Sequence, residues 1–202
     1  FIHGVPSTST PTVSRTYSDR QVTQAPNTRS LGGPGILNNA FGTSGSLSIT
    51  NSLTNPQTRG IVTLADGSIA TVLNTSANSY LVKYSQAGIL ASSSFATGTG
   101  GIFTLTGVTG TNGSLLVNSQ GNFLIRATNP TATLKQVLAN GSAYDSTFNF
   151  TDGAAWGNQL NAVAYQSTDK IIAVGWNGAY GMIRRYLTSG ALDVSFGSSG
   201  QI

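Results

Sequence analysis

The chain has 202 residues and a formal net charge of +4, and only 8% of its residues are charged, against about 25% in ordinary globular proteins. It contains no Glu, no Cys and a single His, His3, which excludes thiolate chemistry and metal sites that need several Cys or His ligands. No apolar stretch reaches the roughly 20 residues of a membrane-spanning helix.

Residues 1–34 differ from the rest of the chain, because they hold four of the six Pro residues and do not repeat. Two interpretations stand: a disordered tail, or an extended N-terminal arm that adds a strand to the edge of a neighbouring subunit. The absence of an initiator Met suggests a processed N-terminus or a fragment of a longer protein. If the segment is an arm, deleting residues 1–30 should leave a folded β domain that no longer assembles. The residues expected to hold the arm are Val13, Arg15, Tyr17, Arg20 and Val22.

A sequence motif recurs along residues 35–202. Its best copies are Gly-Ile-Leu-Asn-Asn-Ala-Phe-Gly-Thr-Ser-Gly at 35–45 and Gly-Ala-Leu-Asp-Val-Ser-Phe-Gly-Ser-Ser-Gly at 190–200. Weaker copies lie between them, and the shared Phe residues are 54, 53 and 48 residues apart. A period near fifty residues indicates a supersecondary unit copied in tandem, as in propellers and solenoids. We expect the shared rings to be mostly buried in equivalent places, and Phe196→Ala to cost about 3–5 kcal/mol. These residues are Phe41, Phe95, Phe148 and Phe196.

Each unit contains a predicted hairpin followed by a third strand. Short apolar runs flank polar turns at Asp66-Gly67, Gln120-Gly121 and Thr168-Asp169. The Gly in the first two turns permits the positive φ of a tight hairpin. Four short antiparallel strands in about fifty residues are typical of a propeller blade, so we expect almost no helix. Third strands are predicted at 80–84, 133–137 and 182–186, and a fourth run precedes the hairpin at 46–50 in the first unit and 101–105 in the second.

The order of these motifs resembles a known family. Asp-Gly-x-Ile, then an Arg-Tyr or Lys-Tyr strand, then Gly-x-Leu-Asp-x-x-Phe-Gly-x-x-Gly is similar to the delta-sixty repeat, and the last unit matches best. The middle units depart from it, because Ala96 and Asn149 follow the Phe and Gln136-Val137 replaces the basic-aromatic pair. The resemblance covers about residues 33–202. It implies a β-propeller domain of unknown function and no shared catalytic residues.

Residue types that carry chemistry are sparse. A Ser-His-Asp triad would need His3 from the N-terminal segment, and the Gly-rich run 98–101 lacks the Lys of a phosphate loop. Arg184-Arg185 is the only basic doublet, and on a strand its members face opposite ways, so no nucleic-acid partner is expected. Glycosidase chemistry needs two carboxylates about 5–9.5 Å apart, but Asp in repeat turns commonly satisfies turn backbone. We therefore expect no enzymatic activity, cofactor or metal. The carboxylates considered are Asp66, Asp145, Asp152, Asp169 and Asp193.

Aromatic residues gather in the third unit. Trp176, Asn177 and Tyr180 belong to a predicted turn with an aromatic residue on each side. Such a turn is a candidate tip for binding a glycan or a peptide, and cross-strand aromatic packing is the structural alternative.

The sequence therefore predicts an all-β fold of tandem four-stranded antiparallel units. This propeller-like domain of about three blades spans residues 35–202, after the arm of residues 1–34. Because propellers need about 4 to 8 blades to close, the domain is expected to stay open with capped edges, to be completed by other chains, or to continue in a longer gene product.

The predicted function is structural and non-enzymatic. The chain would be a subunit of a surface fibre, filament or virion-surface layer that associates with itself through the arm and blade edges. The alternative is an adhesin-like module that binds a glycan or protein through loop-tip aromatics. The Ser-, Thr-, Asn- and Gly-rich composition favours an extracellular or virion-surface location.

Overall fold

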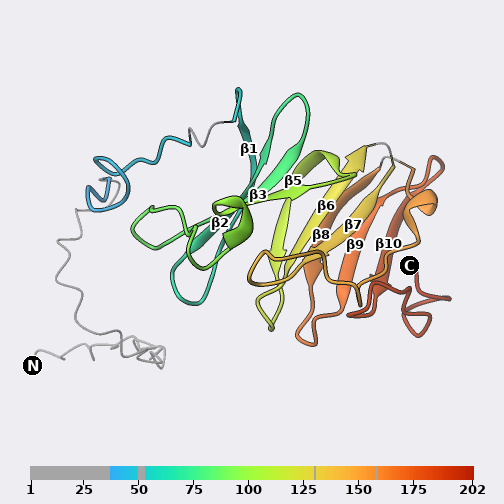
Figure 1. Ribbon diagram of the computed structural model, residues 1–202. Helices are drawn as coiled ribbons and strands as arrows, with labels where there is room; N and C mark the ends of the chain where they lie inside the picture. Colours follow the sequence, from blue (N-terminus) through green and yellow to red (C-terminus); the bar gives the residue numbers. More distant parts are fainter. Residues whose placement is uncertain (1–36, 50–52, 130, 158) are drawn as a thin grey trace, which may run out of the picture. The chain divides into compact units, whose positions relative to one another are not determined.

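The computed structural model describes residues 37–49, 53–129, 131–157 and 159–202, all within one compact unit that spans Gly32–Ile202 (Figure 1). The predicted arm residues Val13, Arg15, Tyr17, Arg20 and Val22 lie outside the described residues, and their role stays a prediction.

In the described part of the chain, ten strands form three antiparallel sheets, with strand orders β1-β2-β3-β4, β5-β6-β7 and β10-β9-β8. The only helical segments among the described residues are two 3-10 turns of three residues each, η1 (Thr97–Thr99) and η2 (Gly153–Ala155). The prediction of an all-β chain is thus confirmed, while the described sheets close into neither a barrel nor a propeller. The strands are β1 (Gln57–Thr63), β2 (Ile69–Asn74), β3 (Ser79–Tyr84), β4 (Ile102–Leu105), β5 (Thr109–Val117), β6 (Phe123–Asn129), β7 (Thr133–Val137), β8 (Leu160–Tyr165), β9 (Ile171–Trp176) and β10 (Gly181–Tyr186).

The three predicted hairpins form, and they share one turn geometry. The residue that follows the first strand donates its N–H to the carbonyl four positions on, as from Leu64 to Ser68 at 2.9 Å and from Gln166 to Lys170 at 2.8 Å. The backbone φ is positive at Gly67 and Gly121, and also at Asp169, where it is 57°. Short polar turns with a left-handed residue therefore set the register of each strand pair.

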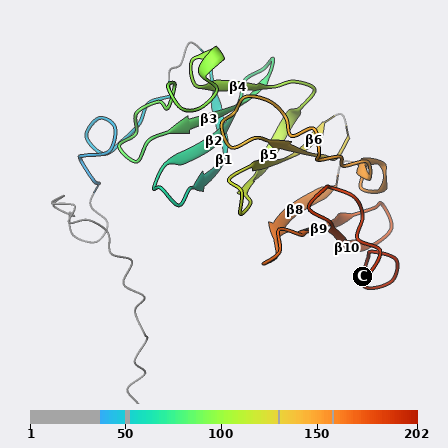
Figure 2. The same cartoon turned by 60° about the horizontal axis from the view of Figure 1, so that its bottom comes forward.

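The fourth run of each unit departs from the prediction. Of the predicted run 101–105, Ile102–Leu105 form the strand β4, which pairs with β3 of the preceding sheet rather than with the second hairpin (Figure 2). Ser46 makes only an isolated bridge to Thr43. The reason is that one edge of β3 has no other partner strand in the described residues. Pairing with β4 satisfies the backbone N–H and C=O groups of that edge.

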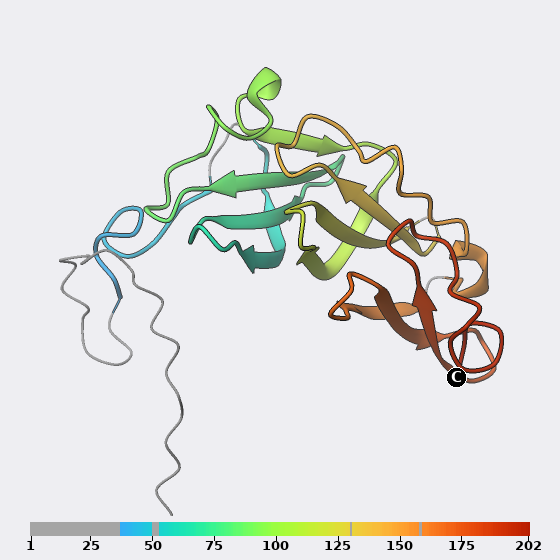
Figure 3. The same ribbon diagram turned by 90° about the horizontal axis from the view of Figure 1, so that it is seen from below.

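The second and third sheets have three described strands each rather than four. In the third, Gln201 bridges Arg184, and Ile183 and Ile202 exchange backbone hydrogen bonds of 3.1 and 2.9 Å. Figure 3 shows the C-terminus close to the last strand. Arg184 lies two residues before Tyr186, the end of β10, just as Val82 lies two residues before Tyr84, the end of β3. The bridge between Arg184 and Gln201 is therefore equivalent to the pairing of Val82 with Ile102 in β4. The last two residues therefore pair with the edge of β10 as β4 pairs with the edge of β3.

Buried apolar residues lie between successive sheets. One cluster joins the first and second sheets through residues such as Val72, Leu81, Phe123 and Ile125. A second joins the second and third sheets through Leu124, Leu134, Trp156, Ile171 and Tyr186. Alternate residues of the second sheet enter opposite clusters, because successive strand side chains point to opposite faces.

A third cluster lies on the other face of the first sheet. Leu73, Val82 and Tyr84 are covered there by the partly buried Leu47, Ile49 and Leu53. The segment before β1 therefore takes the place that a preceding sheet would occupy. None of the helices in the described part of the chain is long and apolar enough to cross a membrane.

Candidate functional site

The recurring Phe residues lie in turns that join one unit to the next. We call these the closing turns, and we call the turn after each third strand, which ends in the recurring Gly, the Gly turn. Phe95 is fully buried, whereas the other three rings are half-buried. The prediction of mostly buried rings therefore holds fully for Phe95 and only in part for Phe41, Phe148 and Phe196.

One hydrogen bond recurs at each junction between a closing turn and the next Gly turn. The N–H of Gly42 donates to the carbonyl of Ala87 at 2.9 Å, and the N–H of Ala96 donates to Asn140 at 2.8 Å. The third instance joins Asn149 to Ser189 at 2.7 Å. In each case the donor follows the repeat Phe and the acceptor precedes the repeat Gly. The closing turn is thus a repeated joint that fastens each unit to the next one.

The recurring Gly of the Gly turn leaves room for this joint. A Cβ placed on Gly141 would lie 2.5 Å from the Phe95 ring, and one on Gly88 would lie 3.2 Å from the Phe41 ring. Real Cβ atoms essentially never make the 2.5 Å contact, and the 3.2 Å contact is tighter than most that they make. The absence of a side chain at these Gly residues is therefore what lets each ring pack closely.

The fourth closing turn, around Phe196 and Gly197, differs from the others because it is not joined to a Gly turn. Within the described residues, no acceptor receives a hydrogen bond from the N–H of Gly197. The Phe196 ring instead lies under the Arg185 guanidinium, with 4.7 Å between the guanidinium carbon and the ring centroid. The last unit therefore presents an unused copy of the joint.

The outward face of the third sheet is apolar and partly exposed. The first and third sheets can be aligned by superposing Tyr84, the last residue of β3, on Tyr186, the last residue of β10. In this alignment Ile172, Val174 and Ile183 of the third sheet take the places of the buried Ala70, Val72 and Leu81 of the first. Ile172 and Val174 are half-buried and Ile183 is 39% exposed. These three residues are in none of the described core clusters. The sequence does not predict this exposed face, because the strand pattern alone does not say which face a following unit covers.

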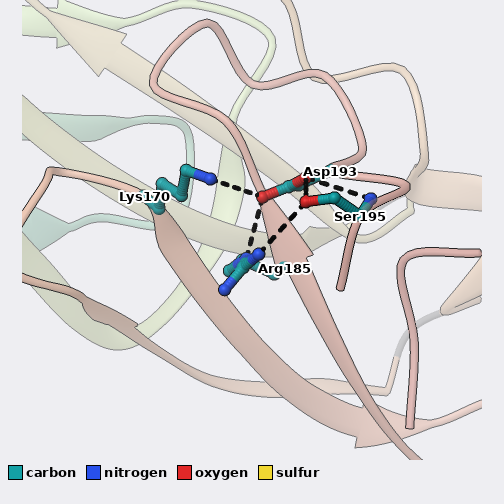
Figure 4. Close-up of polar contacts among 4 residues, drawn as sticks. All are labelled: Lys170, Arg185, Asp193 and Ser195. Atoms are coloured by element: carbon teal, nitrogen blue, oxygen red, sulfur yellow. Dashed lines mark hydrogen bonds and ion pairs between the residues drawn. The ribbon is translucent and has the colours of Figure 1, made fainter. Parts of the chain in front are cut away.

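An ion cluster holds the last closing turn in shape (Figure 4). One oxygen of Asp193 accepts hydrogen bonds from Lys170 Nζ and Arg185 Nε, both at 2.8 Å, and the other accepts from Ser195 Oγ at 2.6 Å. The hydrogen bond from Lys170, with the help of Ser195 and Arg185, holds the pKa of Asp193 far below its ordinary value. Because all of these partners come from the same unit, the cluster stabilises the turn and leaves no carboxylate oxygen free for chemistry.

A second polar network fastens η2 to β10. Tyr186 donates to Asp152 at 2.6 Å and accepts from Trp156 Nε1 at 2.8 Å, and Arg184 Nη1 also donates to Asp152 at 2.6 Å. Burial and the hydrogen bond to Asp152 raise the pKa of Tyr186. Burial would lower the pKa of Arg184, but Asp152 outweighs it and the pKa lies above its ordinary value. The network was not predicted, because Asp152 lies outside the repeated motifs.

The remaining candidate carboxylates also serve the backbone or neighbouring turns. Asp66 accepts from the N–H of Ser68 at 2.8 Å, and Asp145 accepts from the N–H of Thr147 at 2.9 Å, as predicted for turn residues. Asp169 reaches from the third hairpin turn to the second, where it accepts from the N–H of Ser119 at 3.2 Å. It therefore bridges two units.

Asp145 and Asp169 line one polar groove of about 260 Å³ between the second and third units. Its other walls are amide and hydroxyl side chains, and the residue types it brings together can hydrogen-bond a polar ligand. The other lining residues are Asn118, Gln120, Gln136, Thr147, Thr188 and Ser189.

The candidate ligand tip forms between β9 and β10. The Asn177 side chain accepts from the N–H groups of Ala179 and Tyr180 at 2.9 and 3.0 Å, which closes the turn. Trp176 is 44% exposed and Tyr180 is 58% exposed. The structure thus places the three predicted tip residues together, with both rings accessible from solvent.

No protein-family model matches the sequence, and no curated protein matches it. The resemblance to the delta-sixty repeat therefore stays a prediction.

Proposed function

We propose that this chain is a non-enzymatic structural protein that assembles with copies of itself into a surface fibre, filament or virion-surface layer. The observation that carries the proposal is the closing turn. It fastens the segment before β1 to the first unit and joins successive units twice, and a fourth copy stands without a partner among the described residues, beside an exposed apolar sheet face. Exposed apolar faces and open sheet edges invite association.

The proposed architecture is an open, propeller-like stack of about three blades. Two features support it: sheets that bury alternate faces against successive neighbours, and a strand, β4, that crosses back to the preceding sheet. Because propellers close with about 4 to 8 blades, such a stack leaves its last face to another subunit. The predicted arm, residues 1–34, would add a second contact between subunits.

The proposed location is extracellular or on a virion surface. The sparse charge and the Ser-, Thr-, Asn- and Gly-rich surface support it. Electron microscopy of the intact chain tests the proposal. Filaments, rings or sheets built from repeated subunits are expected at high protein concentration. Isolated particles of monomer size at every concentration would contradict the proposal.

The exposed tip favours a second function, an adhesin-like module for a glycan or protein. Trp176 and Tyr180 are partly exposed to solvent, and accessible aromatic rings stack readily on sugars and peptides. Binding on a glycan array that is lost in Trp176→Ala would support this function. Ile61→Ala is the matched control, because Ile61 is 66% exposed and lies on β1, away from the tip. If the two variants behave alike, the tip is not the binding site.

A further inference from the structure

The first and last closing turns, residues 37–46 and 192–201, have the same structure. Gly42 and Gly197 have φ values of 55° and 54°, and Ser44 and Ser199 both have φ of 52°. These are left-handed conformations that side chains rarely adopt. The two ends of the described unit therefore carry one and the same module.

The hydrogen bonds inside the two turns also match. The N–H of Gly45 donates to Phe41 at 3.0 Å, as that of Gly200 donates to Phe196 at 2.8 Å. A Cβ on Gly42 would lie 2.2 Å from the carbonyl oxygen of Ser46, and a Cβ on Gly197 would lie 2.2 Å from that of Gln201.

Only the first of these turns is docked. Gly42 binds the Ala87–Gly88 turn of the first unit, whereas Gly197 has no such acceptor among the described residues. The faces beside the turns correspond as well. The first sheet offers Leu73, Val82 and Tyr84, now covered by residues of the segment before β1, and the third sheet offers an apolar outward face.

We infer that the last closing turn of one copy binds the Ala87–Gly88 turn of a second copy, in place of that copy's own first closing turn. The outward face of the third sheet, with Ile172, Val174 and Ile183, then packs on Leu73, Val82 and Tyr84 of the second copy. This inference rests on the proposed function, and it specifies a head-to-tail assembly by exchange of equivalent elements.

A second copy is the occupant that the geometry favours. The acceptor must be a turn whose carbonyl and Gly match those of the three observed joints. The Ala87–Gly88 turn is such an acceptor. The first closing turn now covers it, and the last closing turn of a second copy, which has the same structure, would take that place. The exchange therefore swaps one closing-turn joint for an equivalent one. The apolar face of the third sheet becomes covered, while Leu47, Ile49 and Leu53 lose their contact with the first sheet.

Two single substitutions at equivalent positions test the competition. Gly42→Val strains the first closing turn and leaves the last one intact, and Gly197→Val does the reverse, because a Cβ meets a carbonyl oxygen at 2.2 Å in both. The intact chain and both variants are compared by light scattering over a range of concentration, with far-UV circular dichroism to confirm the fold. Gly42→Val should increase the assembled fraction at least several-fold, and Gly197→Val should abolish assembly.

A second matched pair keeps the test decisive if either Gly variant fails to fold. Phe41→Ala removes the ring that packs on Gly88, and Phe196→Ala removes its equivalent in the undocked turn. Phe41→Ala should promote assembly and Phe196→Ala should reduce it. Equal effects within both pairs, with the intact chain still assembling, would overturn the exchange and leave the proposed function standing. If neither the intact chain nor any variant assembles, both the exchange and the proposed function are wrong.

Discussion

The Phe95 ring lies directly on Gly141, so that a Cβ on Gly141 would come within 2.5 Å of the ring. The same ring meets Phe123 edge-to-face, with centroids 5.7 Å apart. Phe95 is thus the most enclosed of the repeat aromatic residues and the centre of the joint between the first and second units.

The first prediction concerns the energy of this joint. Phe95→Ala should lower the free energy of unfolding by about 3–5 kcal/mol, because a fully buried ring is lost and a cavity remains. Phe196→Ala should cost less than the 3–5 kcal/mol expected from the sequence, because its ring is only half-buried. Urea unfolding of both variants measures the difference. Equal costs would show that the two rings do not differ in burial.

The second prediction concerns the network around Tyr186. Tyr186→Phe should cost about 1–3 kcal/mol, because Asp152 loses a donor and the buried Trp156 Nε1 loses its acceptor. Tyr180→Phe is the control, since that hydroxyl belongs to an exposed side chain. Thermal unfolding compares them. An unchanged melting temperature in Tyr186→Phe would mean that the network contributes nothing to stability.

The third prediction concerns acid stability. The pKa of Asp193 is lowered in the folded chain from its ordinary value of 3.8, so the unfolded chain binds the proton first as pH falls. The stability that Asp193 supplies should be complete above about pH 5 and decline below pH 4. The difference in unfolding free energy between the intact chain and Asp193→Asn should shrink over that range. A constant difference down to pH 2 would contradict the lowered pKa.

The fourth prediction concerns alkaline pH. Burial raises the pKa of Tyr165 to about 12, although Gln136 donates a hydrogen bond to its hydroxyl. The unfolded chain releases this proton near pH 10, so folding stability should decline as pH rises from 10 to 12. Absorbance titration at 295 nm should show a late-titrating tyrosine that is missing in Tyr165→Phe. If the component that Tyr165→Phe removes titrates near pH 10 instead, Tyr165 is accessible to solvent.

Much of the fold could be predicted because the repeat imposes the same turns three times. Gly67, Gly121 and Asp169 marked the hairpins, and the strand after each hairpin followed from its apolar alternation. The pairing of β4 could not be predicted, because residues 101–105 fit either neighbouring sheet by composition. Only the spatial position of the β3 edge decides between them.

The site was predicted in part. Trp176, Asn177 and Tyr180 could be read as a tip, because a Gly-containing turn between two aromatic residues is a local pattern. The joint between Ala96 and Asn140 could not, because it is made by backbone groups 44 residues apart. The outward face of the third sheet is exposed because no further sheet covers it among the described residues. The local sequence of a strand does not encode whether such a neighbour is present.

Sedimentation equilibrium of the intact chain across a hundred-fold range of concentration tests the central claim most directly. A structural protein that assembles with itself should show a weight-average mass that rises continuously with concentration above the monomer mass. A mass that stays at the monomer value over the whole range would contradict the claim.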